Sequence, residues 1–261
     1  MTRPAPTWDP AQYARFAGPR LRPAFDLLAQ VPAETPARVF DLGCGPGNVT
    51  RLLKARWPQA EVIGLDSSPE MLAKARAEGD DIAYAQQDVA GWTAPHPADV
   101  IVSNAALHWL DDHARLFPHL MAQLAPSGVL AVQMPGNHAR PSHACLFAAA
   151  EAGPWAPKLR PLLRPAPVAA PEEYHRLLAP LTAMLEIWET TYLHALTGRD
   201  PVVEWVKGSV LKPCLDALEG DERAAFLEAY RARIAAAYPP GEDGITLFPF
   251  RRLFIIARGK G

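Results

Sequence analysis

A glycine-rich turn between Val39 and Thr50 constrains the fold of this chain more than any other feature. The segment reads VFDLGCGPGNVT: a short apolar run ends on Asp41, and glycines follow at positions 43, 45 and 47. Glycine has no Cβ atom and adopts positive φ at little cost, so a turn of this composition can pass close to a ligand. The pattern indicates a strand, a ligand-binding turn and a helix, arranged around a nucleotide-like cofactor.

Spacing and charge indicate which cofactor this turn would accept. The dinucleotide fingerprint G-x-G-x-x-G, counted from Gly43, requires a third glycine where the chain has Asn48, and this argues against NAD. The carboxylate of Asp41 would repel a pyrophosphate. It would attract a ligand that carries an ammonium and a sulfonium group and no phosphate. These are the properties of S-adenosylmethionine.

Three further apolar runs lead to polar residues, as expected at the carboxyl edge of a doubly wound sheet. EVIGLD ends on Asp66, about 20 positions after the turn, where such folds place the carboxylate that accepts both ribose hydroxyls. IAYAQQD ends on Asp88, which is suited to accept from the adenine amino group. The run VIV leads into SNAALHW, which contains Asn104 and would line the methyl-transfer pocket. A glycine turn alone is weak evidence, but four such ends in order are strong evidence.

Strand and helix signals alternate from residue 37 to residue 134, which predicts a parallel sheet with helices on both faces. Helices are expected over 49–57, 69–78 and 112–124, and a turn at 126–128 should precede the fifth strand. After Gly136 the alternation stops. Residues 153–171 contain six prolines and are expected to form an irregular cap or lid. The remaining expected elements are a strand over 184–196, helices over 201–218 and 221–238, and a closing antiparallel strand over 246–258.

Composition excludes several classes of function. The formal net charge is -2 and no block of Lys or Arg occurs, so nucleic acid is not an expected partner. No apolar run approaches the ~18 residues of a spanning helix, and the amino terminus lacks a signal-peptide core, so we expect a cytoplasmic protein without a membrane partner. The three cysteines, Cys44, Cys145 and Cys214, are far apart and lack metal-site spacing, which predicts reduced thiols and no metal. The oligomeric state is left open.

In these residues, the chain resembles the trans-aconitate 2-methyltransferase family, class I S-adenosylmethionine-dependent enzymes that esterify a small tricarboxylate. The resemblance covers nearly the whole chain, including WDPAQYARFAGPRLRPAFDLL, DLGCGPGN, GLDSSPEML, SNAALHWL, WETTYLHAL and FPFRRLFIIAR. It implies a Rossmann-like, doubly wound, mostly parallel seven-stranded sheet with a helical cap. The expected parts of this one composite domain are capping helices over 1–30, the cofactor-binding core over 31–136, a helical and proline-rich cap over 137–182, and the rest of the core sheet with inserted helices over 183–261.

The resemblance also implies how the cofactor would be held. Asp41, Gly43 and Gly45 would contact its methionine part, Asp66 its ribose and Asp88 its adenine. The complete predicted cofactor site is Asp41, Gly43, Cys44, Gly45, Asp66, Ser67, Met71, Asp88, Val89 and Asn104.

A carboxylate acceptor simplifies the chemistry. It is already ionised at neutral pH and needs no general base, so no residue is assigned as acid or base; Asn104, His108 and Trp109 would orient the reactants. The other acceptor carboxylates require cations, and arginine binds them with its planar fork. For each arginine taken alone, a solvated surface position is the alternative. The predicted substrate contacts are Tyr13, Arg20, Arg22, His108, Trp109, Tyr192, Arg251 and Arg252.

Three other functions stay open at this point. The same cofactor fold could methylate a different small acid or a hydroxyl group, because fold and cofactor do not determine the acceptor. A cofactor-binding module without turnover is the second, and SNAALHW with the arginine pairs argues against it. A nicotinamide oxidoreductase is the third, and Asp41 with Asn48 argues against it.

Overall fold

The computed structural model describes residues 18, 21–163, 166–207 and 210–261. The chain divides into two compact units. Unit 1 contains the residues up to Pro135 together with Pro167–Glu189 and Leu253–Gly261, and unit 2 contains Gly136–Ala166 and Thr190–Arg252. The segment 137–182, expected to form the cap, is thus shared: its first part belongs to unit 2 and its last part to unit 1.

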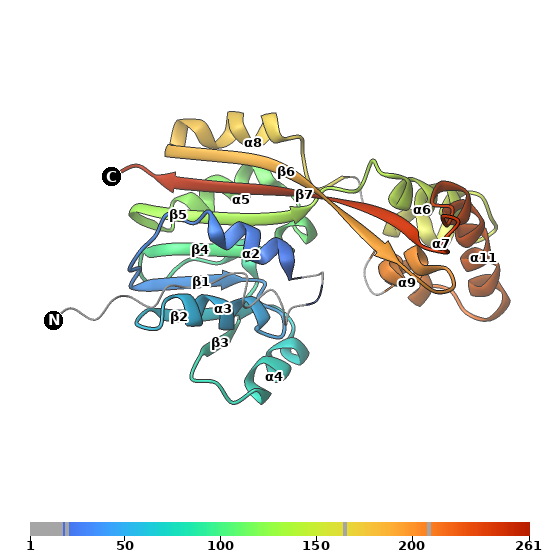
Figure 1. Cartoon of the computed structure of the whole chain (residues 1–261). Helices are drawn as coiled ribbons and strands as arrows, with labels where there is room; N and C mark the ends of the chain where they lie inside the picture. Colours follow the sequence, from blue (N-terminus) through green and yellow to red (C-terminus); the bar gives the residue numbers. More distant parts are fainter. Residues whose placement is uncertain (1–17, 19–20, 164–165, 208–209) are drawn as a thin grey trace. The chain divides into compact units, whose positions relative to one another are not determined.

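A seven-stranded sheet has the strand order β3-β2-β1-β4-β5-β7-β6. The strands β1 to β5 pair in parallel, and Figure 1 shows β6 and β7 running in opposite directions. The prediction of a doubly wound, mostly parallel sheet is therefore confirmed. The strands are β1 (Arg38–Leu42), β2 (Glu61–Asp66), β3 (Ala83–Gln86), β4 (Ala98–Asn104), β5 (Leu124–Pro135), β6 (Thr182–Leu196) and β7 (Thr246–Gly259).

Helices cover both faces of the sheet in unit 1. Phe40, Leu42 and Ile101 point to the face on which Phe117 of α5 and Tyr174 of α8 are buried. The alternate strand residues point to the opposite face, where α2 and α3 lie in front of the sheet in Figure 1. The helical elements of this unit are α2 (Arg22–Ala29), α3 (Asn48–Arg56), α4 (Pro69–Ala77), α5 (His113–Met121) and α8 (Pro171–Leu178), with the short turns η1 (Val89–Gly91), η2 (Leu107–Trp109) and η4 (Ala179–Leu181).

The fifth strand begins earlier than the sequence pattern predicts. Leu124, expected at the end of a helix, pairs with Ala98, while Val129 pairs with Val100. The extra residues form a bulge in which Ser127 has a φ of 60°. The turn expected before the strand thus lies inside β5, because a bulge absorbs extra residues without ending the pairing.

Unit 2 has its own core around Leu146, Trp155, Phe226 and Tyr230. The proline-rich segment is irregular as predicted, with only short helical pieces before α8 begins at Pro171. The single helix predicted over 201–218 is wrong: two helices occur there, and the second has a proline in its first turn, where its missing N–H costs no hydrogen bond. The elements are α6 (Pro141–Glu151), α7 (Ala156–Leu159), η3 (Arg160–Leu162), α9 (Pro201–Lys207), α10 (Lys212–Asp216) and α11 (Gly220–Ala237).

Two findings concern features expected from composition. The cysteines at positions 44, 145 and 214 are free thiols. None of the helices in the described ranges combines the length and the apolar composition that a membrane crossing requires.

Candidate functional site

The turn after β1 has the backbone that its glycines predict. Gly43, Gly45 and Gly47 have φ values of 75°, 55° and 79°. A Cβ atom built on Gly43 would lie 2.2 Å from the Cβ of Ala106, so packing alone requires a glycine there. A Cβ atom on Gly45 would meet nothing within 4 Å among the described residues. Gly45 therefore leaves an open space in which a ligand can approach the backbone.

The carboxylate of Asp66 connects the loops that follow β1 and β2. One oxygen accepts the backbone N–H of Gly45 at 2.8 Å, and the other accepts the backbone N–H of Ser68 at 2.8 Å. Ser68 in turn caps α4, with its side chain accepting the backbone N–H of Met71 at 3.3 Å. Each carboxylate oxygen can accept more than one hydrogen bond, so both retain capacity for ribose hydroxyls. The contact of Asp66 with ribose stays a prediction.

Asp41 is a buried carboxyl group at the carboxyl end of β1. Its side chain accepts the hydroxyl of Thr50 at 2.7 Å. Burial raises the pKa of Asp41 to about 7, the hydrogen bond from Thr50 opposes that rise, and the nearby charge of Asp66 adds to it. A cation placed beside Asp41 would favour the carboxylate, as the ammonium group of S-adenosylmethionine would.

This pKa predicts that the protein binds S-adenosylhomocysteine, which keeps the ammonium group, more tightly as the pH rises from about 6 to 8. The carboxylate form of Asp41 attracts the ligand, and its population grows as the pH passes the folded-state pKa of about 7. The ligand-free protein should lose stability over the same rise, because the folded-state pKa lies above the unfolded one. Calorimetry across this range tests the expectation. A wild-type affinity as flat as that of Asp41→Asn would contradict it.

The connection after β4 packs against the glycine turn. The hydroxyl of Ser103 donates to the carbonyl of Leu42 at 2.8 Å, and Ala105 adopts a φ of 54°, which is unusual for a residue other than glycine. The side-chain oxygen of Asn104 is buried and has no hydrogen-bond partner among the described residues. A buried acceptor of this kind fits a ligand with N–H donors, so this edge suits the expected cofactor.

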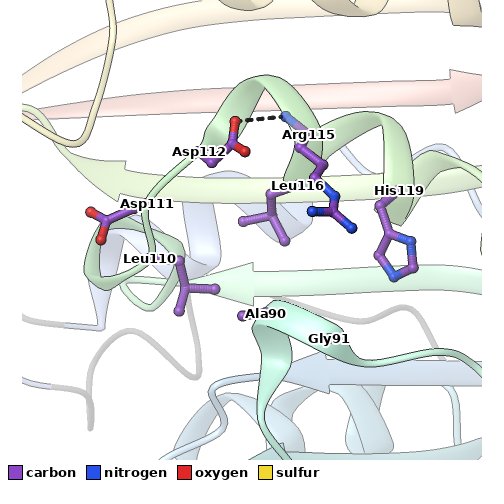
Figure 2. Close-up of a pocket in the computed structure, with 8 residues that line it drawn as sticks. All are labelled: Ala90, Gly91, Leu110, Asp111, Asp112, Arg115, Leu116 and His119. Atoms are coloured by element: carbon purple, nitrogen blue, oxygen red, sulfur yellow. Dashed lines mark hydrogen bonds between the residues drawn. The ribbon is translucent and has the colours of Figure 1, made fainter.

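Asp88, predicted to accept from the adenine amino group, is exposed and caps η1 by accepting the backbone N–H of Ala90 at 3.0 Å, while Val89 is buried. A pocket of about 470 Å³ lies between η1 and the start of α5, next to these two residues in the chain. In Figure 2, Arg115 and Leu116 project from α5 toward η1. The residues that line the pocket are Ala90, Gly91, Leu110, Asp111, Asp112, Arg115, Leu116 and His119.

Other predicted contacts in unit 1 differ in exposure. His108 and Trp109 lie with their ring centroids 4.8 Å apart, and the side chain of Trp109 is 48% exposed. Met71 is 37% exposed on α4. Burial raises the pKa of the Cys44 thiol, so this cysteine stays protonated and packs in the turn. Ser67 is exposed, and its carbonyl accepts from the side chain of Gln86.

The two arginines of FPFRR have different surroundings within unit 2. Arg251 donates from Nε to the carbonyl of Gly136 at 2.8 Å, and its backbone pairs with the side chain of Asn137. Arg252 is only 7% exposed, and its guanidinium carbon lies 4.7 Å from the centroid of the Phe250 ring. Tyr192, also predicted to contact substrate, is buried on β6.

Arg22 is exposed at the first residue of α2, whereas Tyr13 and Arg20 lie outside the described residues. Sequence reasoning missed the roles of Thr50 and His113. The imidazole of His113 is buried, with its ring nitrogens 2.6 Å from the hydroxyl of Tyr174 and 3.0 Å from the carbonyl of Leu107. Thr50 was recognisable as a polar residue one turn into the helix after Asp41, but nothing in the sequence brings Tyr174 to His113.

A family model described as "Methyltransferase domain" matches residues 13–191. The trans-aconitate 2-methyltransferase of Azoarcus sp. is 50% identical over 252 residues, covering 97% of this chain and 99% of that protein. The enzyme of that name from Methylobacterium radiotolerans is 49% identical, with coverage of 96% and 98%.

Among solved structures, the phosphoethanolamine N-methyltransferase 2 of Haemonchus contortus matches with a TM-score of 0.54 and 17% identity. The match covers 91% of this chain and 52% of that one, so the chain spans about half the length of this structure. The likeness concerns the fold.

Proposed function

Because the chain belongs to the trans-aconitate 2-methyltransferase family, we propose that it transfers the methyl group of S-adenosylmethionine to one carboxylate of a small tricarboxylate, with trans-aconitate as the preferred acceptor. The observation that carries this proposal is the identity of about one half with enzymes of that name along nearly the full length of both chains. We also propose a cytoplasmic location and a small-molecule partner, rather than nucleic acid or a membrane.

The residues at the carboxyl edge of β1, β2 and β4 fit the donor. S-adenosylmethionine supplies an electrophilic methyl group on its sulfonium. Asp41 would hold the ammonium group in its ionised form, Asp66 would accept the ribose hydroxyls, and Asn104 would accept an N–H donor with its buried oxygen. The open space over Gly45 leaves room for the donor beside the backbone. Asp88 would accept from the adenine amino group.

On the acceptor side, the protein needs to align an ionised carboxylate with the methyl group and to exclude water. Arg252 combines burial with a planar guanidinium fork, which can bind a carboxylate through two parallel hydrogen bonds. Its position over Phe250 holds the guanidinium in place. We assign Arg252 to a spectator carboxylate, with Asn104, His108 and Trp109 as orienting residues.

Turnover across a panel of acceptors tests the proposal. We expect trans-aconitate to be methylated faster than cis-aconitate, citrate, a monocarboxylic acid or a catechol, and we expect the product to be an ester that alkali hydrolyses. Methylation of the catechol in preference to every carboxylic acid would replace the proposal by a hydroxyl-directed methyltransferase. Ligand-dependent thermal stabilisation without turnover of any acceptor would indicate a binding module.

The pH dependence separates a carboxylate acceptor from one that must lose a proton. At saturating donor, kcat/KM for the acceptor should be nearly flat from about pH 6 to 8, because the acceptor carboxylate is already ionised. His108→Gln, which keeps hydrogen bonding and cannot titrate, should retain most of the activity and the flat profile. Steady-state kinetics of both proteins provide the measurement. A loss of ~10² to 10⁴-fold in this variant, with both substrates still bound, would identify His108 as a general base and rule out simple esterification.

A further inference from the structure

Three side chains outside the predicted site form a network at the flank of the glycine turn. Arg51 of α3 donates to the turn, and Tyr84 of β3 lies against Gly47. Asp80, before β3, binds both Arg51 and Tyr84. We propose that these three residues form a clamp that holds Pro46 and Gly47 in the donor-binding conformation and thereby set the affinity for S-adenosylmethionine. They are positioning residues, since they act through the turn. The proposal rests on the placement of the donor at this turn given under the proposed function.

Arg51 joins the helix to the turn that precedes it. Its Nη2 atom donates to the carbonyl of Pro46 at 3.1 Å and to the side-chain oxygen of Asn48 at 2.9 Å. Its own backbone N–H donates to the carbonyl of Gly47 at 3.0 Å. A single residue therefore fixes three consecutive positions of the turn and the start of α3.

Asp80 and Tyr84 hold the guanidinium of Arg51 in place. Nη1 of Arg51 lies 3.5 Å from the carboxylate of Asp80, and the hydroxyl of Tyr84 donates to the same oxygen at 3.2 Å. Burial raises the pKa of Tyr84 to about 12, so its hydroxyl keeps the proton that it donates. The three side chains form one connected network of hydrogen bonds.

The ring of Tyr84 occupies space that two glycines leave open. A Cβ atom on Gly47 would lie 2.5 Å from the hydroxyl of Tyr84, and one on Gly64 in β2 would lie 2.7 Å from its ring. Real Cβ atoms do not come this close to other heavy atoms, so both positions exclude a larger side chain while Tyr84 is there. The ring of Tyr84 thus packs directly against Gly47, the residue of the turn that has a φ of 79°.

Charge gives Asp80 a second role. The guanidinium of Arg51 lies beside a turn that, under the proposed function, receives a donor with two positive groups. The ion pair with Asp80 compensates this charge, and without it Arg51 would repel the donor. The network therefore combines a mechanical role with an electrostatic one, and each can be removed separately.

Binding of S-adenosylhomocysteine, together with steady-state kinetics for donor and acceptor, tests the clamp. Tyr84→Phe should weaken binding about fivefold, because one hydrogen bond to Asp80 is lost. Arg51→Met should weaken it about tenfold or more, because two hydrogen bonds to the turn and the ion pair with Asp80 are lost. Asp80→Asn should weaken the binding of S-adenosylmethionine, which has the positive sulfonium, more than the binding of S-adenosylhomocysteine, which lacks it. In each variant the KM for the donor should rise, while kcat and the KM for the acceptor stay within about twofold.

Lys54→Met is the matched control, because it removes another cation of α3 that donates to a backbone carbonyl, that of Ala60, away from the turn. If the clamp variants lower Tm but bind S-adenosylhomocysteine like Lys54→Met, the clamp is only structural and the proposal is overturned. Asp66→Asn distinguishes that failure from failure of the proposed donor site. If the clamp variants bind S-adenosylhomocysteine normally and Asp66→Asn binds it weakly, only the clamp proposal is wrong. If all of these variants bind it normally, the proposed donor site is wrong as well. Tyr84→Phe keeps the ring and its packing, so it tests the proposal even where Arg51→Met does not fold.

Discussion

Arg252→Met is expected to raise the KM for trans-aconitate by about a hundredfold or more, with the affinity for S-adenosylmethionine changed by less than about twofold. A guanidinium that binds a carboxylate through two parallel hydrogen bonds contributes far more than a single exposed ion pair. Methionine keeps an apolar chain over the ring of Phe250, whereas the charge and the hydrogen bonds of the guanidinium are lost. Steady-state kinetics with each substrate varied in turn, and donor binding by calorimetry, measure the two effects separately.

The control for this variant is Arg258→Met, which removes an exposed arginine from the same strand, β7. It should leave both KM values unchanged. The rise in acceptor KM caused by Arg252→Met should be smaller for a monocarboxylic acceptor, because this acceptor has no spectator carboxylate to bind. An equal rise in KM for mono- and tricarboxylic acceptors would contradict the role assigned to Arg252.

Gly45→Ala should lower the affinity for the donor by about fiftyfold or more, whereas Gly79→Ala should leave that affinity unchanged. Both glycines have positive φ, 55° and 70°, and a Cβ atom on either would meet nothing within 4 Å in the part of the chain that the structure describes. The backbone strain should therefore be similar, about 1 to 2 kcal/mol. The two substitutions differ in location: Gly79 follows α4, whereas the space over Gly45 is where the donor is proposed to lie.

Thermal unfolding of the two variants, measured with and without S-adenosylhomocysteine, provides the comparison. We expect the two variants to have similar Tm values without ligand. We expect the ligand to raise the Tm of Gly79→Ala only. Equal stabilisation of both variants by the ligand would place the donor elsewhere.

The sequence predicts the carboxyl edge of the sheet well because its signals are local. The glycines at 43, 45 and 47 follow a strand directly, and their positive φ values follow from their positions in the turn. Asp41, Asp66 and Asn104 lie at the ends of β1, β2 and β4, where the alternation of strands and helices predicts them. Parallel strands bring such ends to one edge whatever the helices between them look like.

Contacts that depend on tertiary packing could not be predicted in the same way. The clamp joins α3 to the loop before β3, and no spacing in the sequence relates Arg51 to Asp80. The bulge at Ser127 is likewise visible only once β4 and β5 pair. The exposure of Met71 depends on how α4 packs, which its residue type does not reveal.

The adjacent arginines of FPFRR show the same limit. Neighbouring residues of a strand point to opposite faces, so Arg251 and Arg252 cannot share one environment. The sequence identifies the pair but not which member is buried. The structure places Arg252 on Phe250 and anchors Arg251 to the carbonyl of Gly136.

Under the proposed function, the double hydrogen bonding of Asp66 would link folding with ligand recognition. Because its oxygens already accept the backbone N–H groups of Gly45 and Ser68, the two loops are ordered when the chain folds and not when the donor arrives. Little conformational entropy then remains to be lost on binding, so the site is preorganised. A library screened only for folded protein should consequently retain Asp66, even though no selection for methyl transfer was applied.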